Sequence, residues 1–170
     1  MKRVILSLCF LLIVFSLFGQ RFAYVNTEYV LENIPAYKSA QEKLDQLSYE
    51  WQQELESKQE EIDELSQEFQ NEKVLLTDRM KQKRQEEIQE KKKELNDLKN
   101  KYFGPEGQLY KKRQELVKPI QEEVYNIIQK IANNGNYAII FDSSDKSNIL
   151  FTDPNYDKSD EVLKELGYKK

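Results

Sequence analysis

The side chains that could carry chemistry belong almost entirely to one class. The 170 residues include 30 aspartates and glutamates, no histidine, and a single cysteine, Cys9, in an apolar run at the N-terminus. The lack of histidine excludes the commonest acid–base and metal-binding chemistry. Carboxylate pairs could support hydrolysis, but on charged helices they usually form a solvated face. The glycine-containing segment FGPEG at 103–107 lacks the lysine and the spacing of a phosphate-binding loop. We therefore expect no enzyme, no metal and no cofactor.

The first twenty residues have the pattern of a secretory signal peptide. A basic start at residues 2–3 is followed by an apolar run at 4–18, and Gly19 supplies a small residue for cleavage. We expect the mature chain to begin at Gln20 or Arg21 and to have no stable insertion in a membrane. The alternative is an uncleaved anchor, although a run of about 15 residues is short for the roughly 20 that span a bilayer.

The middle of the chain has the periodicity of a long helix. No Gly or Pro occurs between Ala36 and Tyr102. Apolar residues recur first at alternating steps of three and four and then, after a shift of four, at steps of seven, which indicates a coiled coil with one stutter. The first row is Tyr37, Ala40, Leu44, Leu47 and Trp51, and the second row is Leu55, Ile62, Phe69 and Leu76.

The charges predict that this helix folds back on itself. Residues 39–76 hold eleven acidic and three basic side chains, whereas residues 79–101 hold five acidic and nine basic ones. A turn at 76–78 would lay the acidic half antiparallel to the basic half, with residues 60–64 facing residues 91–93. The alternative is one straight helix whose charges are merely solvated. The candidate caps of the returning helix are Thr77 and Asp78.

A second helical segment follows the interruption at 103–107, and Pro105 could start it. Pro119 should kink this segment, because its ring displaces the carbonyl of Glu115. Residues 133–135, Asn-Asn-Gly, form a stop signal. The apolar stripe of this segment consists of Leu109, Leu116, Val117, Ile120, Val124, Ile127, Ile128 and Ile131.

The N-terminal end of the mature chain predicts one strand. Phe22–Val25 is a short run of β-forming residues. Asn26 or Thr27 then caps a short helix that extends through Ile34, and Pro35 should end it.

The C-terminal end predicts two more strands and a helix. Residues 137–141 and 148–152 are apolar runs separated by a turn. Ser159 is the expected cap of a last helix over 160–166. Three short strands leave unpaired edges and bury little core, so copies of the same chain would usefully cover them. We therefore expect a homo-oligomer that is held together by this region.

These patterns define a fold class and a division of the chain. We expect an α+β chain that is mostly helical, with a small β body and a long antiparallel coiled-coil hairpin as an arm. The signal peptide would occupy residues 1–20, the oligomerisation body residues 21–38 and 104–170, and the arm residues 39–103.

Two end segments and the order of the elements resemble a known family. The segments are Phe22-Ala23-Tyr24-Val25-Asn26 and Tyr137-Ala138-Ile139-Ile140-Phe141-Asp142, with a terminal helix from Ser159 to Leu166. Over essentially the whole mature chain, this is similar to the Skp/OmpH family of periplasmic chaperones. The resemblance implies a periplasmic homotrimer in which three bodies form a barrel-like hub and three arms surround a cavity. It also implies that the cavity holds unfolded outer-membrane β-barrel proteins without ATP.

The chain departs from this family in its charge. Better-known members are basic, whereas removal of residues 1–20 here leaves 24 basic against 30 acidic residues, a net charge of −6. Capture of clients by a positive cavity, and lipid or lipopolysaccharide binding, are therefore not carried over. The acidic balance and the export signal also disfavour nucleic-acid binding.

Two functions from different classes fit these features. One is a holdase chaperone that uses broad apolar contacts, and the other is a structural coiled-coil scaffold or spacer of the cell envelope without clients. An unbroken heptad would suit a spacer better than the interrupted one found here. The candidate client-contacting residues are Trp51, Leu55, Phe69, Leu76, Met80 and Ile88, although for most of them the pattern favours packing in the seam of the hairpin over client contact.

Overall fold

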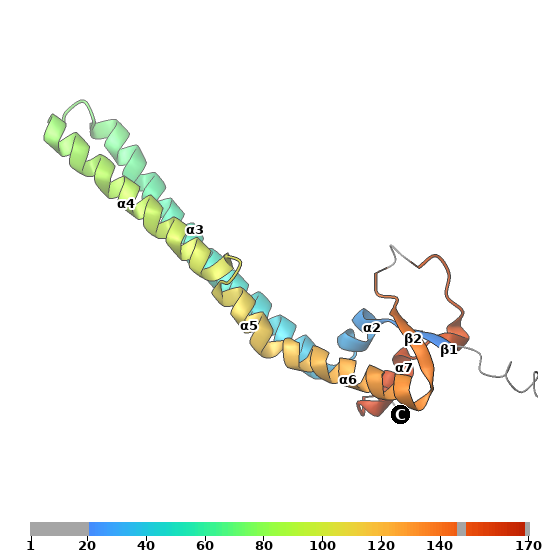
Figure 1. Ribbon diagram of the computed structural model, residues 1–170. Coiled ribbons are helices and arrows are strands. Elements are labelled where there is room, and N and C mark those ends of the chain that lie inside the picture. The colour runs from blue at the N-terminus through green and yellow to red at the C-terminus, as the bar shows by residue number, and fades with distance from the viewer. Residues whose placement is uncertain (1–20, 146–148, 169–170) are drawn as a thin grey trace, which may run out of the picture. The chain divides into compact units, whose positions relative to one another are not determined.

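The computed structural model describes residues 21–145 and 149–168, so the predicted signal peptide lies outside the described residues. The chain divides into two compact units. One contains the described parts of residues 21–34 and 121–168, and the other contains residues 35–120. Helices dominate, and the described residues form one small sheet of two strands (Figure 1). This confirms the predicted class of a mostly helical α+β chain.

Three helices build the unit of residues 35–120: α3 (Pro35–Glu72), α4 (Asp78–Phe103) and α5 (Gln108–Leu116). Helix α3 is long enough to pack against α4 over one part of its length and against α5 over another (Figure 1). Near α5, the buried side chains of Ala40 and Leu44 meet Val117. The interface between α3 and the helices packed against it, called the seam below, is therefore a single layer of apolar side chains. This is expected for two amphipathic helices with a narrow apolar stripe.

The connection between α3 and α4 spans residues 73–77. It begins three residues before the turn that was predicted at 76–78. Thr77 is the N-cap of α4, because its hydroxyl oxygen accepts a hydrogen bond from the backbone N–H of Met80 at 3.4 Å. This cap satisfies one of the unpaired N–H groups that begin every helix, and it was one of the two predicted.

The junction between α4 and α5 depends on two glycines. A Cβ atom on Gly104 would lie 2.4 Å from the carbonyl oxygen of Asn100, and one on Gly107 would lie 2.7 Å from that of Tyr102. Both distances are shorter than van der Waals contact, so the close turn requires glycine. Helix α5 begins at Gln108, so the prediction that Pro105 starts it was wrong.

Two predictions about proline need correction, because each proline lies in the first turn of a new helix. Pro35 does not simply end the short helix α2 (Thr27–Glu32) but is the first residue of α3. Pro119 does not kink a continuous helix, because α5 ends at Leu116 and Pro119 is the second residue of α6 (Lys118–Asn134). Proline is tolerated in a first turn, where its missing N–H would have had no partner.

The unit of residues 21–34 and 121–168 is built around two parallel strands. β1 (Arg21–Val25) pairs with β2 (Tyr137–Asp142), with Ala23 opposite Ile140 and Tyr24 opposite Phe141. Helix α6 ends at Asn134, as predicted, and Asn136 adopts a positive φ of 51° to turn the chain into β2. The buried core of this unit consists of Ala23, Val25, Val30, Leu31, Ile34, Val124, Ile131, Val162 and Leu163.

The predicted strand at 148–152 is wrong for its described residues, since 149–153 adopt no regular structure. Tyr24 on β1 instead bridges to Asp157, and its carbonyl oxygen accepts the backbone N–H of Lys158 at 2.9 Å. The second edge of β1 is therefore occupied at Tyr24, and the described part of the apolar run pairs with neither strand, although the outer edge of β2 is unpaired in the described chain. Sequence pattern alone gives a strand propensity but not a partner.

The last helix, α7 (Ser159–Glu165), begins one residue earlier than predicted. Ser159 is its first residue and not its cap. The Ser159 hydroxyl is buried, donates to the Asp157 carboxylate at 2.6 Å and accepts the backbone N–H of Asn26 at 2.8 Å. These bonds tie α7 to the start of α2, whose own N-cap is Asn26, as predicted.

Candidate binding surfaces

The six candidate contact residues have different environments in the unit of residues 35–120. Phe69 and Ile88 are buried, with 5% and 7% of their surface exposed, so they pack the seam between α3 and α4. Trp51, Leu55 and Leu76 are half-buried, and Met80 is 51% exposed. Only these last four are accessible to a partner.

Trp51 is held in an aromatic cluster. Its ring stacks on Tyr102 with a centroid distance of 4.8 Å and an interplanar angle of 5°, and it meets Phe103 edge-on at 6.2 Å. Both geometries are favourable for the aromatic quadrupole. The position of Trp51 is thus explained by packing across the seam.

A hydrogen bond crosses the seam beside this cluster. The Tyr102 hydroxyl donates to the Glu54 carboxylate at 2.7 Å. This bond, and then burial and the negative charge of Glu54, raise the pKa of the Tyr102 hydroxyl above its ordinary value. The pair fixes the register of α3 against α4 at the end where α4 stops.

The predicted opposition of charged segments is present. The Lys91 ammonium lies 3.3 Å from the Glu61 carboxylate, and both side chains are more than a third exposed. Such an exposed pair contributes at most about 1 kcal/mol, so it specifies register more than stability. Together with the Glu54–Tyr102 bond, it shows that α3 and α4 run antiparallel, as Figure 1 displays.

A hollow of about 570 Å³ lies between α3 and α4. Leu55, Leu95 and Phe103 supply its apolar lining, and Lys92 and Glu56 are among its polar residues. The three apolar side chains are half-buried, so part of their surface is available to an incoming chain.

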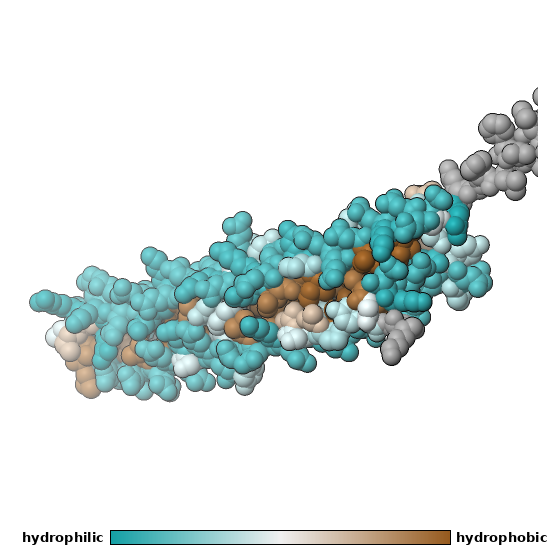
Figure 2. Space-filling view, turned by 90° about the horizontal axis from the view of Figure 1, so that it is seen from below, coloured by the Kyte–Doolittle hydropathy of each residue, from teal (hydrophilic) through white to brown (hydrophobic). Residues whose placement is uncertain are grey.

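The connection at 73–77 exposes apolar side chains that the sequence reading overlooked as sites. Val74 and Leu75 are 87% and 83% exposed. In Figure 2 apolar colouring appears at the left end of the molecule, where this connection lies in Figure 1. The signal was present in the sequence, because a turn made of Lys-Val-Leu-Leu-Thr is unusually apolar.

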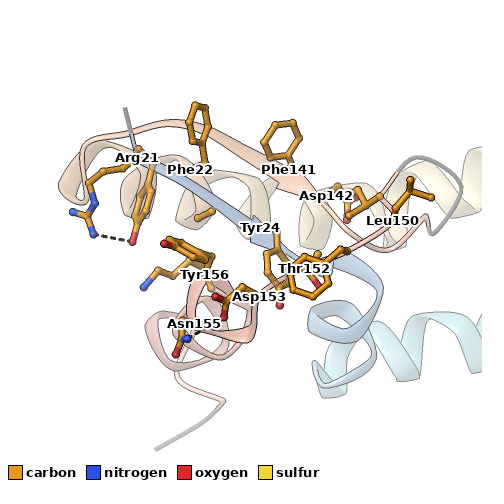
Figure 3. A pocket seen from close by; sticks show the side chains of 15 residues that line it. Arg21, Phe22, Tyr24, Phe141, Asp142, Leu150, Thr152, Asp153, Asn155 and Tyr156 are labelled. Atoms are coloured by element: carbon orange, nitrogen blue, oxygen red, sulfur yellow. Dashed lines mark hydrogen bonds between the residues drawn. The ribbon is translucent and has the colours of Figure 1, made fainter. Parts of the chain in front are cut away.

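A second hollow, of about 1370 Å³, lies in the unit that contains the sheet (Figure 3). The strand register places Phe22, Ile139 and Phe141 on the sheet face opposite the core, each more than 40% exposed. Leu150 and Phe151 flank this face and are almost entirely exposed. The Arg21 guanidinium lies 4.7 Å from the centre of the Tyr137 ring, a cation–π contact at the rim.

One carboxylate beside this hollow is strongly hydrogen-bonded. Burial by itself would raise the pKa of Asp142, but hydrogen bonds from Thr27 and Ser144 outweigh it and lower the pKa below its ordinary value. The Thr27 hydroxyl donates to Asp142 at 2.7 Å and the Ser144 N–H at 3.0 Å. Asp142 thus joins the end of β2 to the start of α2 and has a structural explanation.

No group of three or more acidic, histidine or cysteine side chains within 21–145 and 149–168 is arranged to hold a metal ion. Over the same residues, no helix combines the length and the apolar character needed to span a bilayer.

Comparisons with known proteins agree with this description. Residues 21–166 match the family model described as outer membrane protein (OmpH-like). No curated protein sequence matches the chain. Among solved structures, the chain is similar to a candidate outer membrane chaperone (OmpH-like) from Caulobacter crescentus CB15, with a TM-score of 0.65 and 12% sequence identity. The similarity covers 87% of this chain and 84% of that one, and at this identity it shows a shared fold.

Proposed function

From the premise that the chain belongs to the outer membrane protein (OmpH-like) family, as the sequence resemblance predicted, we propose that it is an ATP-independent holdase chaperone of the periplasm. Its clients would be unfolded outer-membrane β-barrel proteins, which it keeps from aggregating. Family membership supports the chaperone role, and the similar fold of a candidate outer membrane chaperone agrees with it.

The observation that carries the proposal is the thin seam of the α3–α4 pair. Because this seam buries few side chains fully, Trp51, Leu55, Leu76 and Met80 keep accessible apolar surface along the helices. Small, scattered apolar contacts suit unfolded clients whose apolar segments vary in sequence. We assign the first contacts to the hollow beside Leu55, and we assign Phe69 and Ile88 to support of the seam.

The remaining parts of the proposal concern assembly and location. We infer that residues 39–103 act as the arm and that the sheet-containing part of the chain joins copies into a homo-oligomer, a trimer by family resemblance. The support is the exposed apolar sheet face and the outer edge of β2, which pairs with β1 on one side only in the described chain. A cleaved signal at residues 1–20 would deliver the chain to the periplasm.

An aggregation assay tests the function. A urea-unfolded outer-membrane β-barrel protein is diluted into buffer without nucleotide, and light scattering is followed with and without the chain from residue 21 onward. We expect equimolar chain to suppress scattering, and Leu55→Ser to weaken the suppression more than Tyr49→Ser on the exposed face of α3. If the chain does not change the scattering, the holdase proposal is wrong and an envelope scaffold is favoured.

The mass of the chain in solution tests the assembly. Sedimentation equilibrium should give a multiple of the chain mass, and Phe141→Asp should reduce it by placing a charge in the proposed interface. A monomer over the whole concentration range would contradict the assembly but not the holdase activity.

A further inference from the structure

Large apolar side chains gather around the hollow beside the sheet. Phe22 and Phe141 line it, are 42% and 48% exposed, and point to the same side of the strands in Figure 3. In the same lining Leu150 is fully exposed and Phe151 is 83% exposed. Single exposed apolar residues are normal on a protein surface, but a contiguous group of them marks a contact site. We call these four residues and the hollow between them the apolar face.

The N-terminal segment of the sequence joins the chain at the rim of this hollow. Arg21 is the first residue of β1 and belongs to the lining of the hollow. Residues 4–18 carry no charged side chain, and only Gly19 and Gln20 separate them from Arg21. Glycine adopts the conformations that reverse a chain at little cost. Fifteen residues span about 22 Å even as a helix, and a strand of five residues spans about 17 Å, so the apolar run is long enough to cover the face.

Residues 4–18 and a second copy of the chain would compete for the apolar face. A segment tethered by a short linker has an effective concentration in the millimolar range, so it exceeds a second copy at micromolar concentration by about a thousandfold. The tethered run therefore prevails when its contacts are of similar quality. A second copy gains access only after the run has been removed.

We propose that in the uncleaved chain residues 4–18 fold back on the apolar face and block the association of copies. Removal of residues 1–20 uncovers Phe22, Phe141 and Leu150 and allows the oligomer to form. This inference rests on the cleavage and the assembly proposed above. It adds a regulation that neither of them implies, because the chain stays unassembled until it has been exported.

The self-association of two purified chains tests the proposal. The long chain begins at residue 1 and retains the run, and the short chain begins at residue 21. Sedimentation equilibrium at matched concentrations should show at least about tenfold weaker association of the long chain. Phe15→Ser with Phe18→Ser in the long chain should restore association, because polar side chains weaken the hold of the run on an apolar face. Lys2→Gln with Arg3→Gln is the matched control outside the run and should leave the block in place.

Cys9 gives a direct readout of the contact, because it is the single cysteine of the sequence and belongs to the run. In the long chain, Leu150→Cys should crosslink to Cys9 through a short bismaleimide, within one chain and at low protein concentration. Tyr49→Cys is the control, since Tyr49 is 66% exposed but belongs to the unit of residues 35–120. Its crosslinking to Cys9 should be at least about tenfold slower, because no tether holds the run beside it.

Either of two results would overturn the proposal. One is equally tight association of the long chain and an oligomeric short chain, which would leave the proposed assembly intact. The other is equal crosslinking of the Leu150→Cys and Tyr49→Cys variants. If the short chain were itself a monomer, the assembly proposal would fail and this inference with it. The holdase proposal is tested separately, because its aggregation assay uses only the short chain.

Discussion

Replacing Trp51 by alanine distinguishes a packing role of this ring from a direct role in client contact. The ring stacks on Tyr102 at 4.8 Å and meets Phe103 edge-on. A stacked aromatic pair contributes about 1 kcal/mol beyond the area that it buries. A half-buried ring adds about 1–2 kcal/mol of hydrophobic stabilisation. We therefore expect Trp51→Ala to lower the free energy of unfolding of the α3–α4 pair by about 2–3 kcal/mol.

Urea unfolding measures this change. Far-UV circular dichroism follows helix loss, and in the unchanged chain the fluorescence of Trp51, the only tryptophan, reports the same region. Protein concentration must be held fixed, because oligomerisation makes the apparent stability depend on it. Trp51→Phe should recover part of the loss, since a smaller ring can still stack on Tyr102.

Tyr49 is the matched control on the same helix. Its side chain is 66% exposed, so Tyr49→Ala should change the free energy of unfolding by no more than about 0.5 kcal/mol. If Trp51→Ala left stability unchanged while suppression of client aggregation was lost, the packing interpretation would be refuted. Trp51 would then be a client contact, as the sequence first suggested.

Three further substitutions test the seam, the helix junction and the sheet unit. Phe69→Ala should cost about 3 kcal/mol in urea unfolding, the low end for a buried phenylalanine because two helices can close the gap; a loss below about 1 kcal/mol would contradict its burial. Gly104→Ala should cost about 1–3 kcal/mol, because the new Cβ would lie 2.4 Å from a carbonyl oxygen; unchanged hydrogen exchange around residues 100–108 would contradict this. The lowered pKa of Asp142 stabilises the fold above the ordinary aspartate pKa, and this contribution is lost as pH falls through the folded pKa. Thr27→Val should therefore flatten the fall in stability below about pH 4 in acid titration of thermal unfolding, and an unaltered titration would count against the Thr27–Asp142 bond.

The features that sequence predicted well depend on local rules. The apolar period, the absence of Gly and Pro, and the opposite charges of the two halves placed α3 and α4 and the pairing of Glu61 with Lys91. Caps such as Thr77 and stops such as Asn134 follow from the chemistry of the nearest backbone groups. Each of these rules depends on residues that are a few positions apart in the sequence or that recur on one face of a helix.

The candidate contact residues could be recognised only as a group. Periodicity placed Trp51 in the first apolar row and Leu55, Phe69 and Leu76 in the second, but it could not separate buried members from accessible ones. That separation depends on which side chains α4 and α5 place opposite each turn of α3. Val74 and Leu75 were overlooked for the opposite reason, because they belong to no periodic row.

The sequence by itself determined a long charged helix pair with short β segments at the chain ends. The reason is that helix periodicity, turn residues and charge pattern depend only on residues close together in the sequence. What only the tertiary structure decided is which segments become partners. Residues 149–153 have strand propensity but form no strand, and Asp157 and Lys158 lie beside Tyr24 of β1 in their place. Ser159 is not a cap but a buried link between α7 and α2. Its hydroxyl oxygen accepts the backbone N–H of Asn26, which lies 133 positions away in the sequence. Such choices depend on competition between distant segments for the same backbone groups, and no local pattern encodes that competition.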